Sequence, residues 1–192
     1  MNKTVMFSLA ATCLFAVLPV EAMAEKNTTM EVQLSKSQLS LEKVSSPAFG
    51  TQKLTGEAQI LVAQEDLTIT IEDGRAEKTS GWSVYYRLYA YQNSKDKENL
   101  AQAETKIGQG ELRVNGELVG KEDYQAHPLS VKETNQTDQP LLQYHGSATA
   151  DAITYIYTVT KENISLQLPK GTKAGSYSAQ QMISLRDLPE NN

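Results

Sequence analysis

The chain has 192 residues and a single cysteine, Cys13. A disulfide within the chain is therefore excluded. No histidine lies at metal-ligand spacing from another histidine or from a cysteine, so the sequence gives no basis for a zinc or iron site. Long apolar runs are also scarce, because residues 5–20 form the only one. We therefore predict that the protein has no metal and no cofactor.

The apolar run at residues 5–20 has the features of a signal peptide. Lys3 gives it a positive start, and Ala22-Met23-Ala24 supplies the small-residue pattern that signal peptidase recognises. A membrane span needs about 20 apolar residues, and no second run follows, so we expect no membrane span in the mature chain. We predict a signal peptide at residues 1–24, cleavage after Ala24, and a secreted mature domain at residues 25–192.

Cleavage after Ala24 would remove Cys13 from the mature protein. Secreted eukaryotic domains of this size often carry disulfides, so their absence favours a bacterial protein whose core is sufficient alone. The alternative is a lipoprotein anchored through Cys13, although the preceding Ala10-Ala11-Thr12 is a poor lipidation motif.

The sequence lacks a basic cluster or stripe. Without Lys3 and Glu21, the mature chain has 17 basic and 22 acidic residues, and its net charge stays at −5. The charges of both signs are interspersed, as on an ordinary solvated surface. We therefore expect neither nucleic acid nor an anionic membrane as a main partner.

Catalytic patterns are also lacking. The two histidines, His127 and His145, lie in a polar region with prolines and are expected on exposed loops. No serine stands in a nucleophile-elbow pattern. Acidic pairs such as Glu65-Asp66 are adjacent in sequence, so on a strand they point to opposite faces and not across one cleft. Asp73-Gly74 is explained by a turn. We predict that the protein is not an enzyme.

A period of two dominates the hydrophobic pattern. Residues 66–72, 82–91, 153–160 and 163–168 alternate between apolar and polar side chains and are rich in Tyr, Ile, Val and Thr. Such short runs between turn signals are typical of antiparallel sheets with one buried face. We predict an all-β fold, an antiparallel β-sandwich in a single domain. A closed barrel has the same periodicity and is the alternative.

Other segments give more local predictions. Asn115-Gly116 between two short apolar stretches predicts a hairpin. Residues 94–105 predict a short helix, and residues 121–147 predict a long loop with one weak strand. Residues 25–38 indicate a frayed first strand or a lead-in, and residues 177–185 predict the final strand.

The aromatic residues indicate a candidate ligand face. Nine tyrosines stand against three phenylalanines, and Tyr85, Tyr89 and Tyr91 share one strand face with Arg87. Half-polar rings on one face suit stacking against sugar rings while their hydroxyls bond to the ligand. The alternative is that both faces of this strand are packed, since tyrosine is common in half-buried strands. Trp82, on the opposite face, is expected in the core.

Four segments in order resemble the WxL domain of Gram-positive surface proteins. They are Ser46-Pro47-Ala48-Phe49-Gly50-Thr51-Gln52, Ser80-Gly81-Trp82-Ser83-Val84 after the loop Asp73-Gly74-Arg75, Leu168-Pro169-Lys170-Gly171-Thr172-Lys173-Ala174-Gly175-Ser176-Tyr177, and Met182-Ile183-Ser184-Leu185-Arg186-Asp187-Leu188-Pro189. The resemblance covers residues 30–189. It places the signature positions at Trp82, Val84, Ile183 and Leu185.

Two positions depart from the family pattern. Val84 replaces a leucine and keeps an apolar side chain, whereas Ile183 stands where the family has its second tryptophan. A packing role tolerates isoleucine at some cost in stability, but a ring-stacking role does not. The departure therefore indicates that position 183 belongs to the core.

The resemblance implies non-covalent attachment to the peptidoglycan of a Gram-positive cell wall. It also implies partners among other WxL proteins and a membrane-anchored companion, with this chain as a small subunit of a surface complex. One alternative is a protein–protein interaction module that docks on the companion without binding the wall. Another is a secreted enzyme acting on wall glycans, for which no pair of catalytic carboxylates is evident.

Overall fold

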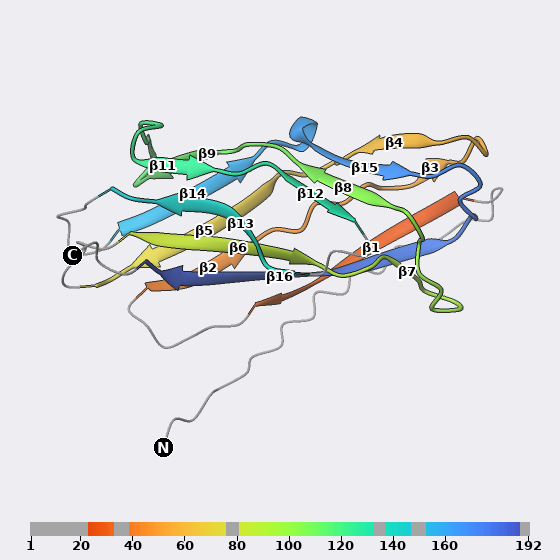
Figure 1. Ribbon diagram of the computed structural model, residues 1–192, viewed down its shortest axis with the longest axis horizontal. Helices are drawn as coiled ribbons and strands as arrows, with labels where there is room; N and C mark the ends of the chain where they lie inside the picture. Colours follow the sequence, from red (N-terminus) through yellow and green to blue (C-terminus); the bar gives the residue numbers. More distant parts are fainter. Residues whose placement is uncertain (1–22, 33–38, 76–80, 133–136, 147–152, 189–192) are drawn as a thin grey trace, which may run out of the picture.

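The computed structural model describes residues 23–32, 39–75, 81–132, 137–146 and 153–188, with side chains from residue 39 onward. Almost every element is a strand (Figure 1). In chain order the strands are β1 (Met23–Val32), β2 (Leu39–Val44), β3 (Gln52–Lys53), β4 (Gln59–Val62), β5 (Leu67–Asp73), β6 (Trp82–Leu88), β7 (Gln92–Asn93), β8 (Glu104–Ile107), β9 (Glu111–Val114), β10 (Glu117–Leu118), β11 (Tyr124–Ala126), β12 (Leu129–Lys132), β13 (Gln139–Tyr144), β14 (Ile153–Val159), β15 (Ile164–Leu168) and β16 (Ser176–Asp187). One 3₁₀ turn, η1 (Lys161–Asn163), joins β14 to β15.

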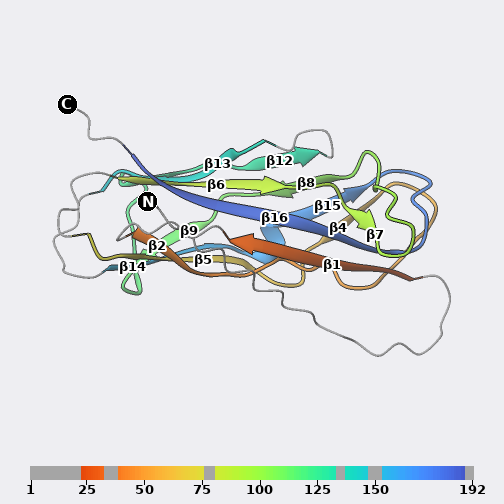
Figure 2. The ribbon, with the colours of Figure 1, turned by 90° about the horizontal axis from the view of Figure 1, so that it is seen from below.

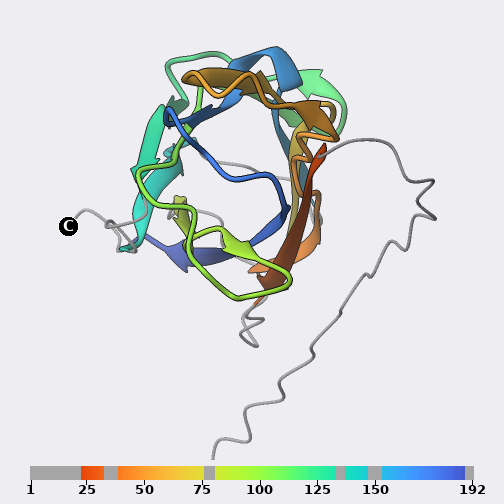
Figure 3. The same cartoon turned by 90° about the vertical axis from the view of Figure 1, so that its right-hand side faces the viewer.

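The strands form three sheets. The first has the order β11-β13-β6-β16-β1-β3, with β7 also paired to β16; the second is β10-β9-β14-β5-β2, and the third is β12-β8-β15-β4. Figure 2 shows β6, β13, β8 and β12 in one layer and β2, β5 and β14 in the opposite layer. Seen from one end, the strands surround a common interior (Figure 3). Within the described residues no backbone ladder joins the three sheets into a closed ring, so the predicted sandwich is confirmed.

Alternation along each strand directs one face into the shared core. Leu67, Ile69 and Ile71 of β5 are fully buried, as are Tyr155 and Tyr157 on the neighbouring β14. Each such aliphatic side chain contributes about 1.5–3 kcal/mol when it leaves water. The strands predicted at residues 66–72, 153–160 and 163–168 are therefore confirmed, to within a residue or two at their ends.

Two turns bear on the local predictions. The hairpin at Asn115-Gly116 is confirmed: these residues have φ of 48° and 91°, and Val119 N donates to Leu112 O at 2.9 Å. The helix predicted at residues 94–105 is wrong. Lys97 and Gln102 adopt φ of 61° and 60°, outside the right-handed helical region, and β8 begins at Glu104.

The loop predicted at residues 121–147 is largely wrong, because this region contains β11, β12 and β13. Each strand is short, and its inward side chains, such as Tyr124, Val131 and Leu142, are buried. A bulge between Pro140 and Leu142 interrupts the alternation in β13. Because of these features, the alternation of apolar and polar residues is hard to recognise in this part of the sequence.

The first strand differs from the rest because it pairs in parallel with β16. Its register runs from Glu25 opposite Ser176 to Val32 opposite Ile183, whereas Met23 and Ala24 pair with β3. The predicted cleavage after Ala24 falls between these two sets of pairs and stays a prediction; residues 1–22 of the predicted signal peptide lie outside the described residues.

Candidate functional site

The two signature segments lie side by side in the first sheet. β6 and β16 run antiparallel, with Trp82 opposite Asp187, Val84 opposite Leu185 and Tyr86 opposite Ile183. Segments 100 residues apart in the sequence therefore form one structural unit. Trp82, Val84 and Ile183 are fully buried, and Leu185 is half-buried against the core.

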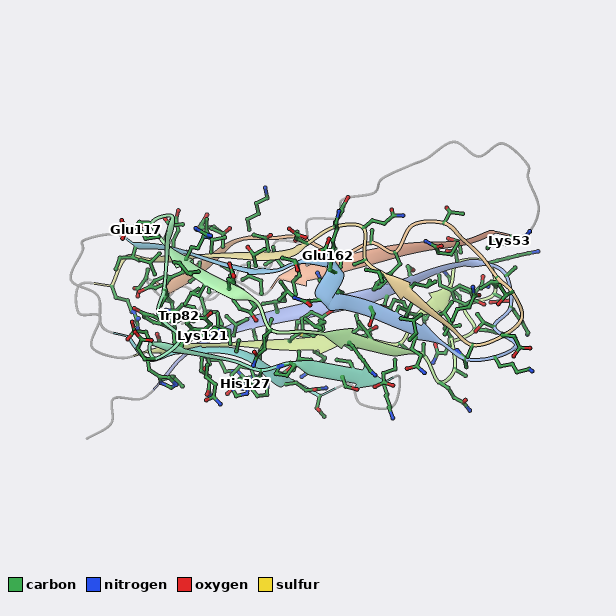
Figure 4. All side chains as sticks on the ribbon, turned by 90° about the horizontal axis from the view of Figure 1, so that it is seen from above. Lys53, Trp82, Glu117, Lys121, His127 and Glu162 are labelled. Carbon is green, nitrogen blue, oxygen red and sulfur yellow. The ribbon has the colours of Figure 1, made fainter. Side chains whose placement is uncertain are left out.

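Trp82 anchors an aromatic cluster inside the sandwich. Its ring stacks on Tyr144 at a centroid distance of 5.4 Å and meets Tyr155 edge-on at 5.1 Å. Figure 4 shows Trp82 towards the end of the molecule that carries Glu117, far from Lys53 at the opposite end. The predicted core position of Trp82 is confirmed, so this indole does not contact a ligand on the surface.

Gly81 precedes Trp82 because no larger residue fits there. A Cβ on Gly81 would collide with the carbonyl oxygen of Tyr144 on the adjacent β13. The backbone oxygen of Gly81 accepts a hydrogen bond from Leu188 N at 3.0 Å. The glycine of the first signature thus lets β13 approach and ties β6 to the segment after β16.

The loop Asp73-Gly74-Arg75 forms an ion-pair latch at the same end. Asp73 is buried, and its carboxylate accepts hydrogen bonds from Arg75 Nε at 2.9 Å and Nη2 at 2.8 Å. Arg75 Nη1 donates to Asp187 Oδ1 at 2.9 Å. The hydrogen bond to Asp73 raises the pKa of Arg75, so the cation is fixed between β5 and β16.

A buried polar network connects β6 and β16 to the segment around Ser46. Tyr86 Oη donates to Gln181 Oε1 at 3.1 Å, and Gln181 Nε2 donates to Ser45 O at 3.1 Å and Ser46 Oγ at 2.8 Å. Burial raises the pKa of Tyr86 well above its ordinary value, so the hydroxyl keeps its proton. On the core side, the segment around Ser46 is therefore joined to β6 and β16 by hydrogen bonds.

The opposite side of β6 carries the predicted tyrosine face, with one correction. Tyr85, Arg87 and Tyr89 are half-buried on the outer side of the sheet. Tyr91 is only 5% exposed, and its hydroxyl lies 2.9 Å from Thr105 Oγ1 in the core. The strand ends at Leu88 and does not continue to residue 91, so the alternation that placed Tyr91 beside Tyr89 is lost.

Two residues that the sequence did not predict complete this surface. Arg186 of β16 places its guanidinium 4.1 Å from the centroid of the Tyr85 ring. Asp138, just before β13, pairs with Arg87 at 2.7 Å and also with Arg186. We call the outer surface formed by Tyr85, Arg87, Tyr89, Asp138 and Arg186 the arginine face.

Hydrogen bonds fix the arginine face from both sides. Arg87 Nη1 donates to Tyr89 Oη at 3.4 Å and Nε donates to Asp138 Oδ1 at 2.8 Å. These bonds, first that to Tyr89 and then that to Asp138, raise the pKa of Arg87. The sequence could have indicated Arg186 only through its position next to signature residue Leu185. No sequence feature indicated Asp138.

The two histidines differ in their surroundings. His145 is exposed, as predicted, while His127 is half-buried with its Nε2 lacking a partner in the described part of the chain. In that part no three His, Cys, Asp or Glu residues gather as metal ligands. Among the same residues no helix is long and apolar enough to cross a membrane.

Comparison with known families gives one match. The family model described as "WxL domain surface cell wall-binding" matches residues 5–189, nearly the whole chain. A search among curated proteins gave no match. The match agrees with the adjacent signature strands, the glycine of the first signature and the position of the last strand. The chain therefore belongs to the WxL-domain family of surface proteins that bind the cell wall.

Proposed function

We propose that this protein is a secreted, non-catalytic component of a Gram-positive cell surface that binds peptidoglycan non-covalently through its arginine face. The observation that carries the proposal is that the two sides of β6 and β16 have different surroundings. Their inner sides bury signature residues Trp82, Val84 and Ile183, and their outer sides present Tyr85, Arg87 and Arg186 to solvent. The outer side is therefore the part of these strands that is available to a wall ligand.

The arginine face has the chemistry of a polymer-binding surface. It combines aromatic rings and guanidinium groups on the outer side of a sheet. Its one carboxylate, Asp138, is held by two arginines and lacks the second carboxylate that glycoside hydrolysis requires. Binding without turnover fits this arrangement.

Sedimentation with purified peptidoglycan tests the proposal. The mature chain, residues 25–192, should sediment with insoluble wall, and Tyr85→Ala together with Arg87→Ala should reduce the bound fraction severalfold. Arg113→Ala is the matched control, because Arg113 is an exposed arginine on β9 of another sheet. Equal sedimentation of both variants would move the site elsewhere, and release of soluble muropeptides by the pure protein would show an enzyme.

A second candidate function is docking on a membrane-anchored companion within a surface complex. The specific observation is an exposed apolar pair on β4, at the edge of the third sheet: Ile60 is 69% exposed and Val62 is 50% exposed. Edge strands accept partner polypeptides, and exposed apolar side chains strengthen such contacts.

Co-purification from cells whose wall has been digested away distinguishes this second function. The partner should be retained by the wild type and lost with Ile60→Ser and Val62→Ser. Leu118→Ser, at an equally exposed apolar residue on β10, is the matched control. A companion that disappears when the wall is digested would show that the wall, and not this edge, holds the two together.

A further inference from the structure

We infer that the arginine face is an anion-binding site, and that Asp138 occupies the position that an acidic group of the wall takes when it binds. This inference rests on the proposed function and names the chemistry that the site recognises. The wall group is a carboxylate or a phosphate. Both carry at least two acceptor oxygens on one atom, which a guanidinium group can bind as a pair.

The geometry around Asp138 is that of a bridged anion. Its Oδ1 accepts from Arg87 Nε at 2.8 Å and lies 2.7 Å from Nη2, while its Oδ2 accepts from Arg186 Nη2. Two guanidiniums from neighbouring strands thus converge on one acidic group. A ligand acid placed between them would receive the same donors.

The cluster is accessible to such a ligand. The side chains of Arg87, Asp138 and Arg186 are 30%, 24% and 50% exposed, so none is sealed in the core. Asp138 comes from the segment before β13, whereas both arginines come from strands paired with each other. A ligand acid would reach the two guanidiniums from the solvent side and take the place of the Asp138 carboxylate.

The charge balance also favours an added anion. Two arginines face a single carboxylate, and among the described residues no other acid lies within ion-pair distance of either guanidinium. Arg186 binds Asp138 through Nη2, and its side chain is 50% exposed. The site is thus locally positive on a chain whose net charge is −5.

The contact between Arg186 and Tyr85 changes the predicted mode of binding. The guanidinium lies over the Tyr85 ring at 4.1 Å, so one face of this ring is already covered by a cation. A sugar stacked on that side would have to displace Arg186. The ring instead orients Arg186 beside Asp138, and what it offers to a wall polymer is a positioned positive charge.

Sedimentation of the full mature chain with intact wall tests the inference directly. Circular dichroism first checks that each variant is folded. Arg87→Gln and Arg186→Gln should then weaken binding about tenfold, whereas Arg113→Gln should bind like the wild type. Asp138→Asn removes the competing charge and should bind at least as tightly as the wild type. Raising the salt concentration should release the wild type far more than Arg87→Gln, because screening acts on the same ion pairs.

The source of the acidic group is identified by two wall preparations. Wall from which phosphate polymers have been stripped should lose binding if the ligand is a phosphate, and wall whose peptide carboxylates have been amidated should lose it if the ligand is a carboxylate. Either loss supports the inference.

Three results would overturn the inference while leaving binding to the wall itself intact. They are wild-type binding by both arginine variants, binding that survives both wall treatments together, and loss of binding in Asp138→Asn. Failure of the wild type to sediment with any wall preparation would instead reject the proposed function. Should Arg87→Gln fail to fold, Arg186→Gln decides the matter, since Arg186 is half exposed near the end of β16.

Discussion

Val84 and Leu185, two of the signature positions, lie opposite each other across β6 and β16. The pair packs against the core together with buried Trp82 and Ile183. The signature residues therefore pack two strands that are distant in the sequence against the same core. The buried residues of the signature contribute to stability, and the proposed ligand surface is the other side of the same strands.

Restoring the family tryptophan at position 183 is expected to destabilise this protein. Ile183 has no exposed surface and lies opposite the large Tyr86 ring, so an indole has no free volume. We expect Ile183→Trp to cost about 1–3 kcal/mol of unfolding free energy, as overpacked cores do, without improving wall sedimentation. Urea unfolding measures the cost, and Ile183→Leu, which conserves volume, should stay below about 1.5 kcal/mol. A gain in stability for the tryptophan variant would reveal a cavity here.

Removal of Arg75 should cost far more stability than removal of its exposed partner. Asp73 has no exposed side-chain surface and would be left as an uncompensated buried charge, at about 3–5 kcal/mol for Arg75→Ala. Asp187 is 51% exposed, and Asp187→Ala should cost about 1 kcal/mol or less. Chemical denaturation of both variants gives the comparison. Equal costs would mean that water reaches Asp73 once the arginine is gone.

Substitution of Gly81 should disturb the pairing of β6 with β13. Its new methyl group would meet backbone, the carbonyl of Tyr144, which cannot move without shifting the strand. We expect Gly81→Ala to cost about 1–3 kcal/mol and to change the near-ultraviolet circular dichroism of Trp82, which stacks on Tyr144. Gly116→Ala is the control: its φ of 91° gives strain of about 1 kcal/mol, but no atom lies near the added carbon. An unchanged Trp82 signal in the first variant would contradict the assigned role.

Alkaline pH should unfold the protein through its buried tyrosines. Burial raises the pKa of Tyr157 to about 12, so above pH 10 the folded chain retains a proton that the unfolded chain releases. The stabilisation is complete below pH 10 and is lost as pH rises towards 12, at about 1.4 kcal/mol per pH unit for this residue.

Tyr157→Phe provides the measurement for the alkaline prediction. Gly110 N loses its acceptor, the hydroxyl 2.9 Å away, so the variant should be about 1–3 kcal/mol less stable at pH 8. Its unfolding free energy should then fall less steeply between pH 10 and 12 than that of the wild type. Parallel curves for the two proteins would show that Tyr157 does not ionise with unfolding.

Much of the fold follows from the sequence because its main strands bury one face each. Alternation at Leu67, Ile69 and Ile71 predicted β5, and Asn115-Gly116 predicted the β9–β10 hairpin. The rest depends on contacts between distant residues. Lys97 and Gln102 adopt positive φ and prevent the expected helix, and the bulge after Pro140 hides β13 from a search for period two.

The candidate site was only half predictable for the same reason. Tyr85, Arg87 and Tyr89 share one strand face and could be grouped from the alternation of side chains along a strand. Asp138 reaches Arg87 from 51 residues further along the chain, and no local pattern marks such a partner. The prediction for Tyr91 was wrong because side chains alternate between two faces only within a strand, and β6 ends at Leu88.

The position of β16 has a consequence for the order of events in biosynthesis. This strand lies between β6 and β1, yet its residues follow those of β6 by almost a hundred positions. A chain that emerges from its N-terminus first cannot complete the first sheet until residues 176–187 are available. Folding is then late and governed by long-range contacts, which are slow to form. For a secreted precursor this delay would keep the first sheet incomplete, and the polypeptide able to pass through a translocation channel, until β16 has crossed.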